Sequence, residues 1–153
     1  MKFIIFITTL TLISTTLLGK GLNVYGLGVY DIKFDGSEKN QASDFRYEFR
    51  SDNSLFDIGP KEDNFFFVKP FFGIEYTSDS ASYFLTGVYF EDNLGELLEG
   101  NKSKFFFTPS FGAGLYDDGS GKKLGNDIQF RTSLELNYQL KNNNRIGISF
   151  SHI

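Results

Sequence analysis

The strongest constraint in this sequence is a two-residue alternation of apolar and polar side chains over residues 128–140. One parity carries Ile, Phe, Thr, Leu, Leu, Tyr and Leu, whereas the other carries Gln, Arg, Ser, Glu, Asn and Gln. A helix would scatter these apolar groups around its whole circumference, so the pattern predicts a β-strand. The run is also longer than an ordinary globular strand, usually about 5–6 residues, and suits a strand tilted across a membrane.

Similar runs recur along the chain and are separated by stretches rich in Asp, Asn, Gly and Ser, which are turn residues. They predict seven strands, at residues 22–34, 44–50, 65–77, 82–91, 105–116, 128–140 and 145–153. With 153 residues and no break in composition, one domain is expected. The predicted fold class is all-β, an antiparallel up-and-down transmembrane β-barrel.

Two of the predicted strands contain a proline, Pro70 and Pro109, and each proline follows a run of aromatic residues. Strands two apart in a meander run in the same direction, so the shared pattern suggests a common membrane boundary. Proline cannot donate to a ladder and is normally confined to bulges, strand starts or edges. The registers of these two strands are therefore the least defined by sequence.

The N-terminus reads as a secretory signal peptide over residues 1–19. Met1 and Lys2 give a short basic start, an apolar run softened by Thr and Ser follows, and Gly19 offers a small residue for cleavage. The run is shorter than the roughly 20 apolar residues that a membrane helix needs. Export is therefore expected, with the barrel domain at residues 20–153.

Composition excludes several classes of protein. Removal of the signal peptide takes away one lysine and lowers the formal net charge from −4 to −5, and no basic stripe remains to bind nucleic acid. The absence of cysteine excludes a disulfide framework and a cysteine-bearing zinc site. The high count of 19 Phe and 8 Tyr fits the aromatic girdles of an outer-membrane barrel.

Alternation alone does not tell the inside of a barrel from its outside. A soluble barrel that binds a ligand is apolar inside, whereas a small membrane barrel is apolar outside. Export, strand length, aromatic content and glycine-rich strands favour the membrane. Inward charged residues would then need partners, because a narrow lumen desolvates them; these are Lys69, Glu75, Arg131 and Glu135.

An open seven-stranded sheet is not stable in lipid, because each unpaired backbone group at its edges costs several kcal/mol there. Bacterial single-chain barrels have an even number of strands. The sequence ends inside the strand pattern, at Ile153. We therefore expect that the barrel lacks its last strand here.

His152 is the only histidine. It shares a parity with Ile146, Ile148 and Phe150, so it is expected on the apolar face. An ionisable group on a lipid-facing surface is a functional hypothesis by default. The alternative is an incidental histidine near the headgroups at a strand end.

Residues 124–130 (Leu-Gly-Asn-Asp-Ile-Gln-Phe) and 145–153 (Arg-Ile-Gly-Ile-Ser-Phe-Ser-His-Ile) resemble the outer-membrane lipid A 3-O-deacylases, the PagL-like acyloxyacyl hydrolase family. The resemblance is best over about the last 30 residues. It implies an eight-stranded barrel that hydrolyses an ester-linked acyl chain of lipid A in lipopolysaccharide. Serine would be the nucleophile, histidine the general base and glutamate the group that orients it, without a metal or a cofactor.

Carried onto this chain, His152 matches the general base and Phe130 an aromatic residue beside the site. Thr132 stands where the family often has Asp. The nucleophile would be the first residue beyond Ile153 and the glutamate would lie further out, so the chain is expected to be inactive. Ser149 and Ser151 are excluded as substitutes because their parity is opposite to that of His152.

Other chemistry finds little support. There is no Gly-x-Ser-x-Gly elbow, and the Lys-bearing and Asp-bearing turns lack the spacing of phosphate and EF-hand loops. The leading hypothesis is an outer-membrane serine-type esterase acting on lipid A. The alternatives are a noncatalytic small outer-membrane barrel with a structural or surface-interaction role and, third, a periplasmic barrel with a lipid in its lumen.

Overall fold

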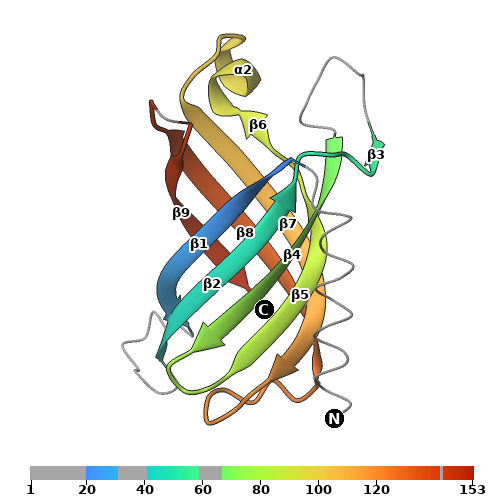
Figure 1. Ribbon diagram of the computed structural model, residues 1–153, viewed down its shortest axis with the longest axis vertical. Coiled ribbons are helices and arrows are strands. Elements are labelled where there is room, and N and C mark those ends of the chain that lie inside the picture. The colour runs from blue at the N-terminus through green and yellow to red at the C-terminus, as the bar shows by residue number, and fades with distance from the viewer. Residues whose placement is uncertain (1–19, 31–40, 59–66, 142) are drawn as a thin grey trace.

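The computed structural model describes residues 20–30, 41–58, 67–141 and 143–153. Its main feature is one strongly curled antiparallel sheet in which the long strands follow the order β1-β2-β4-β5-β7-β8-β9 (Figure 1). These strands are β1 Gly21–Tyr30, β2 Ala42–Ser51, β4 Phe67–Thr77, β5 Ser82–Tyr89, β7 Phe105–Asp117, β8 Ile128–Gln139 and β9 Arg145–His152. The predicted fold class is confirmed as an all-β, antiparallel, up-and-down sheet.

Each predicted strand coincides with one of these seven long strands, with ends that differ by a few residues. The agreement follows from topology, because every long strand pairs with the next long strand along the chain and short connections favour such pairing. The predicted signal peptide at residues 1–19 lies outside the described residues. So do residues 31–34 and 65–66 of two predicted strands.

Three short elements were not predicted, and all lie at one end of the sheet, called here the α2 end. They are β3 Phe56–Asp57, β6 Asp92–Asn93 and the helix α2 Leu94–Glu99. The Asn93 side chain caps α2 by accepting from the N–H groups of Gly95 and Glu96, and Gly100 ends the helix at φ 70°. The capping residues Asn93 and Gly100 are present in the sequence, but a helix of six residues is too short to show a helical periodicity of apolar side chains.

Both strand prolines sit where their strand changes its neighbour. On one side of β4 the partner is β2 as far as Phe71 and then β3 from Val68, so Pro70 falls between the two ladders. On β7 the partner is β5 as far as Ser110 and then β6 from Phe107, so Pro109 falls at the equivalent break. A missing N–H costs least at such a junction.

Burial shows that the sheet is polar inside and apolar outside. Its buried polar and charged side chains include Arg46, Glu48, Arg50, Glu75, Arg131, Ser133 and Glu135. Its exposed apolar side chains include Leu27, Phe84, Leu115, Leu134, Ile148 and Phe150. This is the arrangement of a membrane barrel, and it is the reverse of a lipid-binding lumen. No helix among the described residues is long and apolar enough to cross a membrane.

The curl brings the two edge strands, β1 and β9, to the same side of the molecule (Figure 1). Tyr30 at the end of β1 donates to Tyr116 on β7, and Arg46 on β2 reaches Ser149 on β9 at 3.2 Å. Both edge strands start at the α2 end and are parallel, and the described residues form no ladder between them. A gap of about 1230 Å³ separates them.

Candidate functional site

The site predicted around His152 is built on three neighbouring strands, β7, β8 and β9. In the ladder registers Phe111 lies opposite Thr132, and Thr132 lies opposite His152. These three residues therefore form one row across the sheet. Directly opposite residues have Cβ atoms about 4.5–5.5 Å apart, so Thr132 is the immediate cross-strand neighbour of His152.

This row faces outward. Thr132 and His152 are exposed, Phe111 is 51% exposed, and the alternate residues on the same strands turn toward the lumen. Phe150, the next outward residue on β9, is 63% exposed. The imidazole thus stands in an apolar surface that a membrane barrel turns toward lipid.

The two serines on β9 face the lumen, as their parity predicts. The Ser151 hydroxyl donates to Ser133 at 3.0 Å, and Ser149 accepts from Arg46 at 3.2 Å. Both hydroxyls are therefore on the opposite side of the sheet from His152. Neither is placed to exchange a proton with its imidazole.

Phe130, the predicted aromatic neighbour, lies two residues before Thr132 on β8 and is 60% exposed. Its ring stacks on Phe111, with centroids 6.0 Å apart and planes inclined by 15°. Sequence reasoning placed Phe130 beside the site but missed Phe111. The sequence alone gave no signal for it, because Phe111 and Phe130 are brought onto the same face by the β7–β8 register, in which Phe111 pairs with Thr132 and Ala113 pairs with Phe130.

Within the described part of the chain, the His152 imidazole makes no hydrogen bond and no ion pair. Thr132 and Tyr138 carry the only hydroxyls on the outward parity of β8 and β9, and only Thr132 is in the row of His152. The roles assigned to His152, Phe130 and Thr132 stay predictions. So does the assignment of the nucleophile and the orienting glutamate to other residues.

The lumen behind this site is filled by charged side chains that pair with one another. Arg131 donates to both Glu75 and Glu48, and Arg50 donates to Glu48 at 2.8 Å and to Glu135 at 2.9 Å. Buried charges require such partners, because an unpaired one would carry a large desolvation cost. The expectation that Glu75, Arg131 and Glu135 pair is confirmed.

Lys69 is the exception among the predicted inward charges. No ion pair holds it in the described residues; its ammonium group lies 5.9 Å from the centroid of the Tyr89 ring. Lys69 is only half-buried at the α2 end, so water supplies part of its solvation. The prediction that Lys69 needs an ionic partner stays a prediction.

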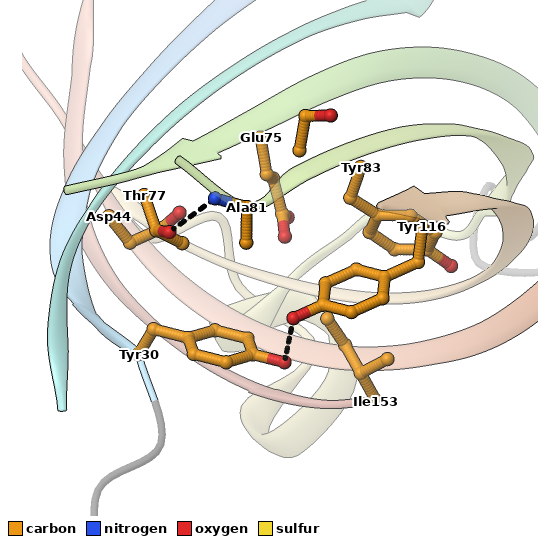
Figure 2. Close-up of a pocket in the computed structure, with 9 residues that line it drawn as sticks. Tyr30, Asp44, Glu75, Thr77, Ala81, Tyr83, Tyr116 and Ile153 are labelled. Atoms are coloured by element: carbon orange, nitrogen blue, oxygen red, sulfur yellow. Dashed lines mark hydrogen bonds between the residues drawn. The ribbon is translucent and has the colours of Figure 1, made fainter. Parts of the chain in front are cut away.

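A small cavity lies inside the curl near the ends of β1 and β4 (Figure 2). Its volume is about 10 Å³, which is roughly the space for one water molecule. Tyr30 and Tyr116 meet through their hydroxyls at its border, and Ile153 points into it. The cavity is far too small for an acyl chain, and Ile153 confirms that the residue after His152 turns inward.

No group of three or more His, Cys, Asp or Glu side chains in the described residues is arranged to hold a metal ion. What the outward site offers is a lone imidazole, a neighbouring hydroxyl and a wall of aromatic rings. An imidazole of this kind is suited to general base work at the edge of an apolar phase.

Comparison with known families gives one match. The model of a family described as lipid A 3-O-deacylase (PagL) matches residues 23–153. The match covers every described strand except the first two residues of β1. No curated protein and no solved structure matches the chain.

Proposed function

Because the chain belongs to the lipid A 3-O-deacylase (PagL) family, we propose that it is a serine-type esterase that hydrolyses an ester-linked acyl chain of lipid A at the outward site around His152. The family is found in the outer membrane and acts on lipid A of lipopolysaccharide. One observation of this molecule carries the proposal. The only histidine of the sequence stands on the apolar outer face, in a row with Thr132 and Phe111.

The outward position matches the chemistry. An acyl chain of lipid A is embedded in the membrane, so an enzyme that cleaves its ester has to present the reacting groups on the lipid-facing side of the barrel. A histidine in the lumen, among the paired Arg and Glu side chains, would not meet this substrate. The polar interior instead gives a rigid support for the outer face.

His152 acts as the general base in the proposed reaction. Its imidazole takes the proton of the nucleophilic serine hydroxyl, whose oxygen attacks the ester carbonyl. The tetrahedral intermediate expels the sugar alkoxide, which receives the proton from the imidazolium, and an acyl-enzyme remains. Water, deprotonated by the same imidazole, then releases the fatty acid and restores the enzyme.

Phe130 and Thr132 support the base in this proposal. The Phe130 ring covers the surface next to the row and excludes water from it. Thr132 is the closest polar side chain across the ladder, and its hydroxyl can hold one imidazole nitrogen in a fixed tautomer. A threonine is neutral, so it stabilises the imidazolium less than the aspartate that the family often has at this place.

The test is mass spectrometry of lipid A from cells that express the full-length protein in their outer membrane. The expected result is the loss of one acyl chain with the wild-type protein and unchanged lipid A with His152→Ala. Since His152 is exposed, the variant should insert and fold like the wild type, which heat-modifiable mobility on gels checks. Unchanged lipid A with abundant, folded wild-type protein would favour the noncatalytic barrel instead.

The nucleophile is identified by a second measurement. Rapid quenching of the reaction, digestion and mass spectrometry locate the acylated residue. The proposal expects a serine. Acylation of Thr132 would overturn the serine assignment and make the threonine the nucleophile, with His152 still as its base.

A further inference from the structure

Phe111 and Phe130 form an unusual feature on the outer face. Among the ring pairs of the described residues, theirs is the most nearly parallel, at 15°; the other pairs are inclined by 33° to 73°. The two phenylalanines occupy diagonal positions on β7 and β8, since Phe111 pairs with Thr132 and Phe130 pairs with Ala113. The stacked rings bridge the two strands as one wall.

Small side chains occupy the other diagonal of the same square. Ala113 lies beside Phe130, and Thr132 lies beside Phe111. The outer surface therefore forms a shallow depression on each side of the stacked rings, because these side chains are short. The low position at Thr132 adjoins His152 directly, because these two residues are paired across β8 and β9.

From this arrangement we infer that Phe111 is a positioning residue for the acyl chain of the substrate. The inference rests on the proposed function and deepens it. The acyl chain lies along the stacked rings of Phe111 and Phe130 and crosses the shallow depression at Thr132. This path brings the ester carbonyl of the substrate to the imidazole of His152. Saturated methylenes are the chemical class that such a wall accepts.

Orientation, and not hydrophobic transfer, is what the wall contributes. An acyl chain that already lies in lipid gains little by moving onto an apolar protein surface, since lipid tails are as apolar as leucine. A rigid wall that ends at the base restricts the chain to poses in which the ester is close to the reacting groups. The effect grows with the length of chain that contacts the rings.

The experiment compares Phe111→Ala with Phe84→Ala in the full-length protein in detergent micelles, with p-nitrophenyl esters of 4-carbon and 14-carbon acids as substrates. Phe84 is the matched control, because it is a 53% exposed outward phenylalanine on β5, away from the row of His152. Circular dichroism checks that each variant keeps its strand content.

We expect kcat/KM of Phe111→Ala to fall about tenfold for the 14-carbon ester and less than twofold for the 4-carbon ester. Phe84→Ala should change neither value, and Phe111→Leu should restore part of the loss. An equal fall for both esters, or no fall with an active wild type, would overturn the role of Phe111 alone. An inactive, folded wild type would overturn the proposed function together with this inference.

Discussion

Replacement of Arg131 by methionine tests whether the lumen network holds the sheet together. Arg131 is 1% exposed and is the cation that binds the Glu75 carboxylate. It also binds Glu48, which keeps Arg50 at 2.8 Å as a second partner. Methionine fills a similar volume without charge, so the variant isolates the loss of one guanidinium and leaves Glu75 as the orphaned carboxylate.

The magnitude follows from the burial of Glu75, which is 9% exposed and pairs with Arg131. Removal of one partner from a buried ion pair costs about 3–5 kcal/mol, because it leaves an uncompensated buried charge. The free energy of unfolding should therefore fall by about 3–5 kcal/mol at pH 7.

The assay is a urea titration of the protein in lipid vesicles at pH 7, followed by far-ultraviolet circular dichroism. Arg145→Met is the matched control, since Arg145 also pairs with a glutamate, Glu91, but at a partly exposed position. Its cost should stay near 1 kcal/mol or below. A loss below about 1 kcal/mol for Arg131→Met at pH 7 would refute the reasoning.

Two further substitutions test the packing and the α2 end. Gly114→Ala should destabilise the sheet by about 1–3 kcal/mol in urea titrations, because a Cβ atom there would overlap the Phe84 carbonyl oxygen. Gly28→Ala, where the nearest atom is 3.9 Å away, should have little effect; equal stability of the two variants would contradict the β5–β7 packing. Asn93→Ala should cost about 1 kcal/mol and speed amide exchange in α2, and unchanged exchange would show that the cap is dispensable.

The strands were predictable because their signal is local. Every strand carries its own alternation, and each long strand pairs with the next, so no long-range information is needed to order them. The elements of the α2 end were not predictable in this way. The two-residue strands β3 and β6 exist only because β4 and β7 extend beyond their long partners and offer free backbone groups.

The alternation of apolar and polar residues does not show which face of the sheet is outside. The charged side chains do show it. Arg131, Glu75 and Glu48 come from three different strands, and only a curl with these residues inside brings them within bonding distance. The opposite curl would expose the ion network to lipid and bury the phenylalanines, including Phe111. The charged parity therefore selects the direction of the curl, and the curl in turn places His152 on the apolar surface.

The position of His152 within that surface depends on a single turn. In the turn between β8 and β9, the Leu140 N–H donates to the Asn144 carbonyl and the Asn143 N–H donates to the Leu140 carbonyl. Asn143 has a φ of 64°. This turn pairs Gln139 with Arg145 and, seven residues on, Thr132 with His152. A register shift of one residue would place Arg131 or Ser133 opposite His152 and turn the imidazole toward the lumen. Sequence parity could assign His152 to a face, but its neighbours Thr132 and Phe111 follow only from the geometry of this turn and of the β7–β8 ladder.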